Sequence, residues 1–400
     1  MTAHFGRLRS RMASLDVDGL VATTIENIRY LTGISSVALE MFPHTGQCFA
    51  VVTRDRPDNP WFVSSRCEAD QFLDAGPELA GVTAYGTFFR EPAVEGVALT
   101  PAEERLRAVN GDGISPATAA EALVATVRAA GLAESRIGVD EDGLRPDVLE
   151  ALRAALPRAA FLPAAGAIRQ VRKVKTDAEL ELVARSAAVM ETAIRATVSI
   201  ARPGVTERQL VREFERTVAG AGGRSRFTLI KIGRSAVAGQ SAPSDEPLRR
   251  GDAIWFDVGG TVDGYWSDIA RVHCVGEPSP RLEKYYNAML AGEDAALAAA
   301  RPGMTGRELF EITVNAVRAA GVPHYRRQHV GHGIGVEVYD PVLITPDSED
   351  VIEDGTVVNI ETPYYEFGLG AVHVEDPFVV RAGGNALLTT LDRDLGVGEG

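Results

Sequence analysis

The sequence predicts a protein of two α/β domains, and three observations lead to this prediction. The chain has 400 residues, which is more than one ordinary hydrophobic core accommodates. Over residues 5–160, short apolar runs alternate with helical stretches, an order typical of α/β domains. Beyond that stretch the pattern changes to long helices and an internal repeat. We therefore expect one domain over residues 1–165 and a second over residues 166–400.

The first domain opens with an amphipathic helix that begins at residues 5–12, and a short buried strand follows at residues 18–23. Further apolar runs and Ala- and Arg-rich helical stretches alternate after it. The strand candidates are residues 46–53, 61–63 and 137–139, and the helical stretches are residues 117–131 and 146–156. The run 156–167 then indicates a domain boundary.

The second domain begins with a long helical pattern over residues 176–200. Thr176 followed three residues later by Glu179 forms the sequence of a capping box, which marks a helix N-terminus. We expect a second helix after Thr206 and a third near residues 281–299.

An internal repeat connects the two halves of this domain. ARPGVTERQL at residues 201–210 matches ARPGMTGREL at residues 300–309. Downstream of each copy, an apolar strand pattern ends in an acid, GDAIWFD at residues 251–257 and GTVVNIE at residues 355–361. Two copies of a helix–helix–hairpin unit would be related by a pseudo-twofold axis.

The repeat also pairs acidic residues. Asp257 and Glu361 each stand six residues after a glycine, and a further acid follows in each half, Asp268 and Glu375. Burying ionised carboxylates in apolar strands is unfavourable unless a cation or hydrogen bonds compensate. Four carboxylates in one place would also repel one another. Bound divalent cations would remove both this repulsion and the penalty of burying the charges. The pattern therefore predicts a metal site.

His332, in the glycine-rich segment 331–335, supplies a nitrogen donor to the same set. Four carboxylates and one imidazole suit Mn, Fe, Co or Zn rather than a metal that prefers thiolates. Two such ions roughly 3.5–4 Å apart can hold and activate a water molecule, whose pKa falls from about 15.7 towards about 7. The expected cofactors are two divalent ions.

Each of these residues taken alone would more often be structural, and only their joint placement favours a metal centre. Asp263, before Gly264, has the context of a turn acid. His324 and His329 stay open as site residues, because a shift of one residue along a strand moves a side chain to the other face.

Composition excludes several classes of protein. The formal net charge of −14 argues against a nucleic-acid partner, which requires a basic surface. No apolar run is long enough to span a membrane, and no secretory signal follows Met1. Three widely spaced cysteines indicate neither a disulfide framework nor a thiolate metal site. We expect a cytoplasmic protein.

The second domain resembles the pita-bread metallohydrolases, which include aminopeptidase P, prolidase, methionine aminopeptidase and creatinase. The resemblance rests on the motifs FDVGG (256–260), GYWSDIAR (264–271), GHGIG (331–335), IE (360–361) and VED (374–376). The first domain resembles the creatinase/prolidase type through ENIRYLTG (26–33), and KTDAEL (175–180) resembles the linker between the domains. The implied fold is a creatinase-like α/β domain followed by a pseudo-twofold α+β pita-bread domain.

The resemblance implies a function for each matching position. Five residues would be the metal ligands: Asp257, Asp268, His332, Glu361 and Glu375. The catalytic candidates are Glu361, which would also shuttle a proton, Tyr339 and His373. The substrate-binding candidates are Gln240, Gln328, His329, Tyr339 and His373. A homodimer is implied by the resemblance alone.

Several of these positions depart from the peptidases of the family. Prolidase-like enzymes have histidine at the positions of Gln240, Tyr339 and Gln328, and arginine at the position of His373. These groups bind and polarise the peptide in those enzymes. We therefore expect a metal-dependent hydrolase of an amide or other C–N bond in a small molecule or short peptide, with an altered substrate pocket.

Three alternatives remain from the sequence. The first is a genuine Xaa-Pro dipeptidase or aminopeptidase with a rearranged pocket. The second is a metal-dependent lyase that removes a proton from a small zwitterion. The third is a binding module without catalysis, which the retained ligand set argues against.

Overall fold

The computed structural model describes residues 3–398, in two compact units that meet between Val171 and Arg172. The sequence predicts a domain boundary at residue 165, a few residues earlier. The difference is helix α7 (Ala165–Arg172), nearly all of which belongs to the first unit. Each unit has its own sheet and its own hydrophobic clusters.

The first unit is built on a six-stranded mixed sheet with the strand order β4-β3-β2-β1-β5-β6. Strand β1 pairs antiparallel with β2 and parallel with β5. The strands are β1 (Gly19–Ala22), β2 (Phe49–Thr53), β3 (Trp61–Ser65), β4 (Gly81–Tyr85), β5 (Arg136–Val139) and β6 (Ala160–Pro163). The helices besides α7 are α1 (Phe5–Ser14), α2 (Ile25–Thr32), α3 (Val37–Met41), the 3-10 helix η1 (Arg66–Asp74), α4 (Pro101–Asn110), α5 (Ala119–Ala129) and α6 (Pro146–Ala155).

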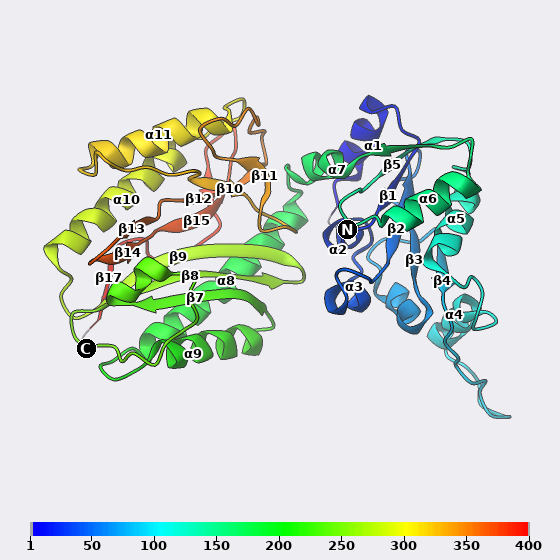
Figure 1. Cartoon of the computed structure of the whole chain (residues 1–400), viewed down its shortest axis with the longest axis horizontal. Helices are drawn as coiled ribbons and strands as arrows, with labels where there is room; N and C mark the ends of the chain where they lie inside the picture. Colours follow the sequence, from blue (N-terminus) through cyan, green and yellow to red (C-terminus); the bar gives the residue numbers. More distant parts are fainter. Residues whose placement is uncertain (1–2, 399–400) are drawn as a thin grey trace. The chain divides into compact units, whose positions relative to one another are not determined.

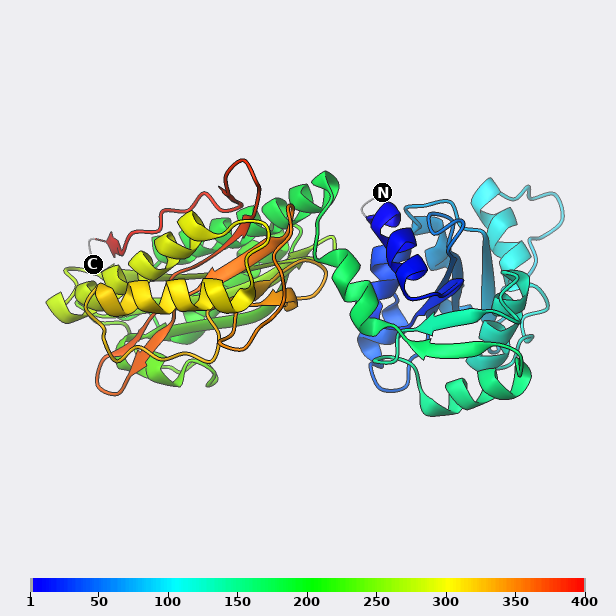
Figure 2. The same cartoon turned by 90° about the horizontal axis from the view of Figure 1, so that it is seen from above.

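Helices cover both faces of this sheet (Figure 2). Along β1, Leu20 and Ala22 join a core with α1, α2 and α7, whereas Val21 joins a core with α5 and α6. Side chains alternate between the faces of a strand, so a strand between two helical layers reads as a continuous apolar run. The predicted strands at residues 18–23, 46–53, 61–63 and 137–139 are confirmed, and β4 and β6 are additional.

The second unit contains a nine-stranded, curled sheet (Figure 1). Its main path is β11-β10-β12-β15-β9-β8-β7, with β16 on β15 and β17 on β9, and a separate β13–β14 hairpin lies beside it. The strands are β7 (Arg224–Ile232), β8 (Ala253–Val262), β9 (Tyr265–Val275), β10 (Gly331–Gly333), β11 (Asp340–Leu343), β12 (Val357–Glu361), β13 (Tyr364–Glu366), β14 (Gly370–Val372), β15 (Glu375–Val379), β16 (Ala386–Leu387) and β17 (Gly396–Gly398).

Two helix pairs pack against this sheet in the repeated arrangement that the sequence predicts. Helices α8 (Asp177–Ser199) and α9 (Glu207–Gly220) pack with β7 to β9. Helices α10 (Pro280–Ala299) and α11 (Gly306–Ala319) pack with each other, and α10 also packs with β12. The short 3-10 helix η2 (Gly233–Ala238) follows β7. Figure 1 shows one pair on each side of the strands. The predicted fold class, a creatinase-type α/β domain and a pita-bread domain, is confirmed.

The matching segments of the repeat have matching local structure. Thr206 begins α9 and Thr305 begins α11, each with a complete capping box. Thr206 forms an isolated bridge to Pro247, and Thr305 forms the equivalent bridge to Val351. Each capping box satisfies backbone N–H groups that the first turn of a helix leaves free. The internal repeat is therefore a structural repeat.

The register of the strands brings acidic residues to one face of the sheet. Asp257 pairs with Ala270, Ala270 with Glu375, and Glu375 with Glu361, so these positions form one row across four strands. Residues in one row of neighbouring strands face the same side, and so do residues two apart on a strand. Asp268 lies two residues before Ala270 on β9 and therefore shares that face.

A tight turn joins β8 to β9. Asp263 and Gly264 occupy its two central positions with φ of 49° and 82°. Two successive residues with positive φ are typical of the turns that join hairpin strands, and Asp and Gly tolerate them best. Asp263 is thus a turn acid, as its context predicts.

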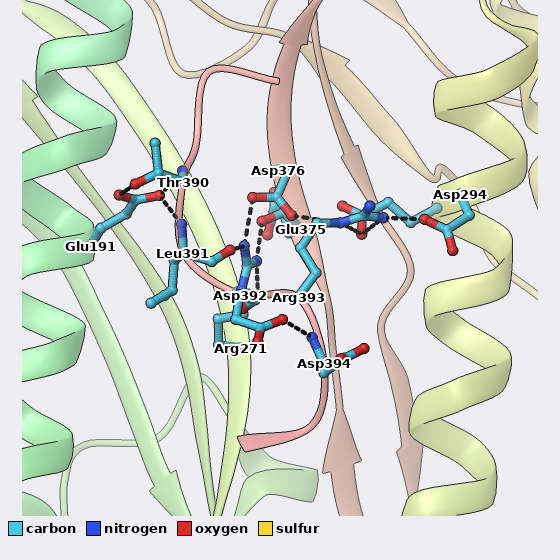
Figure 3. Close-up of polar contacts among 12 residues, drawn as sticks. Glu191, Arg271, Asp294, Glu375, Asp376, Thr390, Leu391, Asp392, Arg393 and Asp394 are labelled. Atoms are coloured by element: carbon cyan, nitrogen blue, oxygen red, sulfur yellow. Dashed lines mark hydrogen bonds and ion pairs between the residues drawn. The ribbon is translucent and has the colours of Figure 1, made fainter. Parts of the chain in front are cut away.

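Buried charges tie the C-terminal segment to the sheet (Figure 3). Glu191 on α8 accepts hydrogen bonds from the Thr390 hydroxyl (2.7 Å) and the Leu391 N–H (2.6 Å). Arg271 on β9 donates to the carbonyl oxygens of Leu391 (3.1 Å) and Asp392 (2.9 Å).

None of the helices within residues 3–398 combines the length and apolar character that a membrane span requires.

Candidate metal centre

The structure brings together the five residues that the sequence singles out as metal ligands. Asp257 lies on β8, Asp268 on β9, His332 on β10, Glu361 at the end of β12, and Glu375 at the start of β15. His332 pairs with Asn359, which lies two residues before Glu361, so the imidazole belongs to the same face as the acids. Four of the five are buried, and the Asp257 side chain is 15% exposed.

His332 lies against two of the acids. Its Nε2 is 3.9 Å from Asp268 Oδ2 and 4.0 Å from Glu375 Oε1, distances too long for hydrogen bonds. Its Nδ1 is 3.0 Å from the Gly333 carbonyl oxygen. Because Nδ1 donates its proton in a hydrogen bond to that carbonyl, Nε2 carries a lone pair. That lone pair faces the acids and can bind a metal ion.

His373 lies among three acids. Its Nε2 is 3.3 Å from Glu375 Oε2 and 3.7 Å from Glu361 Oε2, and its Nδ1 is 3.8 Å from Asp257 Oδ2. Neither ring nitrogen has a hydrogen-bond partner among the described residues, although the side chain is 1% exposed. The ring stacks beside Trp255 at 6.1 Å between centroids.

Burial dominates the electrostatics of this cluster. It raises the pKa of Asp257 to about 7, with a further increase from Glu361 and an opposing effect of Arg327. It also raises the pKa values of Asp268 and Glu375, and the neighbouring acids add to both shifts. These acids cannot all ionise in one buried space without added positive charge.

The histidines and Glu361 show the opposite tendency. Burial lowers the pKa of His332 and brings that of His373 to about 3, so both imidazoles are neutral, the form that binds metals. For Glu361, burial raises the pKa, but the close contact with His329 is the main effect that opposes it, and the pKa falls to about 2. Glu361 is therefore the acid best suited to carry a charge.

Neighbouring side chains orient the acids. The Asn359 amide donates to Glu375 Oε1 at 2.5 Å. Arg271 donates to the Glu375 carbonyl oxygen at 3.0 Å and to Asp376 Oδ1 at 2.7 Å (Figure 3). His329 Nδ1 lies 2.8 Å from Glu361 Oε1. Such outer contacts set the direction of ligand lone pairs.

A cavity of about 520 Å³ lies beside the acids and includes Asp257 and Glu361 in its wall. Four substrate-binding candidates line it: Gln240, Gln328, His329 and Tyr339. The Tyr339 ring stacks on the His332 ring, with 3.9 Å between centroids. His373 is not among the lining residues, because it lies buried behind the acids.

The position of the two ambiguous histidines follows from these contacts. His329 lies in the cavity wall beside Glu361. His324 is exposed, and its Nε2 is hydrogen-bonded to the Tyr364 hydroxyl at 2.9 Å.

Two large polar side chains of the cavity wall, Arg327 and Tyr365, are absent from the site residues that the sequence predicts. The Arg327 guanidinium lies 5.8 Å from the centre of the Tyr365 ring, and its Nε has no hydrogen-bond partner in the described part of the chain. A sequence signal existed, because Arg326 and Arg327 stand shortly before His332. The sequence does not show which of the two arginines faces the acids.

The chemistry of these donors fits divalent cations. Carboxylate oxygens and neutral imidazole nitrogens converge in a buried space, and Asp268 Oδ1 has no hydrogen-bond partner among residues 3–398. Two overlapping groups have donor atoms within 4.8 Å of one another: Asp268, His332 and Glu375, and Glu361, His373 and Glu375. The residues present therefore fit metal ions.

A curled sheet of two repeated halves, with buried acids and a histidine on one face, defines a metal-dependent hydrolase of the pita-bread class. The chain belongs to the family described as "Metallopeptidase family M24", whose model matches residues 181–382. A model described as "Creatinase/Prolidase N-terminal domain" matches residues 79–174.

Relatives agree with this assignment. The chain is 25% identical to the uncharacterized peptidase YqhT of Bacillus subtilis, over 97% of this chain and 98% of that one. It is 30% identical to the Xaa-Pro dipeptidase of Pyrococcus furiosus, over 57% of this chain and 66% of that one.

Solved structures show the same fold. An Xaa-Pro dipeptidase from Bacillus anthracis superimposes with a TM-score of 0.78 at 24% identity, covering 98% of this chain and 99% of that one. A dipeptidase from Pyrococcus horikoshii gives a TM-score of 0.79 at 21% identity, with the same coverage.

Proposed function

We propose that this protein uses two divalent ions, of Mn, Co, Fe or Zn, to hydrolyse an amide or other C–N bond in a short peptide or small molecule. The observation that carries the proposal is the set of acids from four neighbouring strands, which meets His332 on one face of the sheet. Asp257, Asp268, His332, Glu361 and Glu375 would hold the ions.

Ions of this kind lower the pKa of water towards about 7 and polarise a carbonyl group. The chain's own residues would bind the substrate and move protons around it. Glu361, whose Oε1 lies 2.8 Å from His329 Nδ1, would accept a proton during the reaction. The Tyr339 hydroxyl can donate a hydrogen bond to a substrate oxygen in the cavity.

Two observations bear on the substrate class. The relatives named Xaa-Pro dipeptidases support a short peptide and make a genuine Xaa-Pro dipeptidase the second candidate function. The cavity wall argues for an altered substrate, because Gln240, Gln328 and Tyr339 are neutral where prolidase-like enzymes place histidines. Neutral groups form weaker hydrogen bonds to a developing charge than an imidazolium does.

The test is a panel of Xaa-Pro dipeptides, other dipeptides and small amides, assayed with protein loaded with Mn, Co or Zn. We expect turnover of at least one amide outside the Xaa-Pro group to exceed turnover of every Xaa-Pro dipeptide. Faster turnover of an Xaa-Pro dipeptide would favour the second candidate.

The same assay in ¹⁸O-labelled water distinguishes hydrolysis from elimination. A hydrolase incorporates one labelled oxygen into the product, whereas a lyase incorporates none. Asp268→Asn is the inactive control, because it removes one charged ligand and should abolish turnover.

We also propose a homodimer, as the family resemblance implies, and a cytoplasmic location, which three cysteines without a disulfide favour. Light scattering of the purified chain measures the mass directly, and a mass of 42.7 kDa would correspond to a monomer and contradict the proposal.

A further inference from the structure

We propose that His373 is a sixth protein ligand of the metal centre, so that each of the two metal positions has its own histidine. His332 would serve one position with Asp268 and Glu375, and His373 the other with Glu361 and Glu375. The inference rests on the proposed dinuclear centre and specifies its ligands.

The distances around His373 are close to those between donors that share an ion. Protein nitrogens and oxygens bind such metals at about 2.0–2.2 Å, so two ligands of one ion lie about 3.0–3.6 Å apart. His373 Nε2 is 3.3 Å from Glu375 Oε2 and 3.7 Å from Glu361 Oε2. Both distances are shorter than those from His332 Nε2 to Asp268 (3.9 Å) and Glu375 (4.0 Å).

Hydrogen bonding does not account for the position of His373. Both ring nitrogens are buried and lack a hydrogen-bond partner in the part of the chain that the structure describes. A buried polar atom without a partner costs about 1–3 kcal/mol. A metal ion on Nε2 would satisfy that nitrogen, and the parallel Trp255 ring holds the imidazole in place for it.

The geometry also explains why His373 does not line the substrate cavity. It stands two residues before Glu375, next to the start of β15, and points at the acids from behind the cavity wall. The arginine that related peptidases have at this position cannot be a ligand, because a guanidinium keeps its proton. A second nitrogen donor should also move metal preference from Mn towards Co or Zn.

In the first experiment, metal-stripped protein is titrated with Co²⁺. Calorimetry and the visible absorption of bound cobalt measure the binding. We expect two ions on the wild-type chain. His373→Ala should weaken one site by more than about 100-fold, since the loss of an outer-shell contact alone costs about 10–100-fold. The other site should keep its affinity and its absorption band.

Two variants complete the comparison. His373→Arg, which restores the residue of related peptidases, should give the same loss at one site. His324→Ala is the matched control, because His324 is an exposed histidine of the same unit and is hydrogen-bonded to Tyr364. It should bind two ions as the wild type does.

A second measurement requires no variant and so does not depend on the folding of His373→Ala. X-ray absorption of the wild type loaded with two zinc ions counts the imidazoles, and we expect an average of one imidazole per zinc. An average of one half would leave His332 as the sole histidine ligand and overturn the proposal.

The outcomes separate this inference from the proposed function. Two unaltered sites in His373→Ala would overturn the inference and leave a five-ligand centre intact. A wild-type chain that binds no cobalt would contradict the dinuclear function itself.

Discussion

At the scale of single residues, Tyr339 both contacts a candidate metal ligand and lines the cavity. Its ring stacks on His332, and 47% of its surface is exposed towards solvent and the cavity. Burial raises the pKa of its hydroxyl, and the charge of Glu361 adds to this, so Tyr339 stays protonated. It can donate a hydrogen bond, but it cannot supply a positive charge.

We predict that Tyr339→His increases kcat/KM for Xaa-Pro dipeptides. One donor aimed at a transition-state charge contributes about 10²–10³ in rate, and an imidazole restores the type of donor that related peptidases carry. Tyr339→Phe is the control, since it keeps the ring and loses the hydroxyl, and it should not improve cleavage. Equal rates for wild type and Tyr339→His would refute this explanation of the altered pocket.

Arg327 sets the charge that the cavity offers to a substrate. Two divalent ions would balance the four acids of the centre, so Arg327 would leave the cavity with a net positive charge. Its Nε lacks a hydrogen-bond partner among the described residues, and it lies against Tyr365. A substrate with a carboxylate or another anionic group would satisfy it.

We predict that Arg327→Gln raises KM for such a substrate about 10- to 100-fold and changes kcat less, since a hydrogen bond to a charged group contributes about 1.5–3 kcal/mol. The comparison uses proline dipeptides and their C-terminal amides. Arg326→Gln, at the exposed neighbour, is the matched control. A KM that rises equally for acid and amide would show that Arg327 does not bind the anionic group.

At the scale of elements, the first turn of α8 contains an acid whose protonation affects stability. Glu179 accepts from the Thr176 N–H at 2.9 Å and from the Tyr265 hydroxyl at 3.2 Å. Burial nevertheless dominates and raises the pKa of Glu179 to about 7 from its ordinary value of 4.5. The folded chain therefore holds a proton between these pH values that the unfolded chain has lost.

The pKa of Glu179 is higher in the folded chain than in the unfolded chain. The contribution of Glu179 to the free energy of unfolding is therefore present below about pH 4.5 and is lost as pH rises to about 7. We predict that Glu179→Gln removes this loss, which is on the order of 3 kcal/mol at its maximum. The melting temperature of the variant relative to wild type should increase from pH 5 to pH 8. Glu181→Gln, an exposed position on the same helix, should show no such trend.

At the scale of the whole molecule, metal binding should stabilise the second unit. Ions that bind only the folded chain add about 2.7 kcal/mol per site when their concentration is 100 times Kd. For a unit of this size, each kcal/mol shifts the melting temperature by about 2–4 °C. Without ions, burial raises the pKa values of Asp268 and Glu375, and repulsion from the neighbouring acids adds to both shifts.

We predict that a chelator, which empties both sites, lowers the melting temperature by about 10–20 °C and that Co²⁺ or Mn²⁺ restores it. Calorimetry measures the shift, and elemental analysis confirms that the metal is gone. Glu375→Gln should melt at a lower temperature and respond less to chelator. An unchanged melting temperature after full removal of metal would mean that hydrogen bonds alone stabilise the acids.

Much of the molecule was predictable from local patterns. Short apolar runs located four of the six strands of the first unit, and the capping sequence at Thr176 located the start of α8. A helix was also expected after Thr206, where α9 begins. These signals depend on neighbours within a few residues, so the sequence contains them directly. Strands β4 and β6 were missed, since four or five residues without clear alternation give a weak signal.

The sequence by itself determined the two repeated halves, the α/β class and the identity of five residues that the structure brings to one face of the sheet. Only the tertiary structure decided that His329 rather than His324 lies in the cavity and that Arg327 lines it. It also decided that His373 is buried among the acids. Those outcomes depend on strand register and on side chains that meet from distant segments, and no short-range pattern in the chain encodes them.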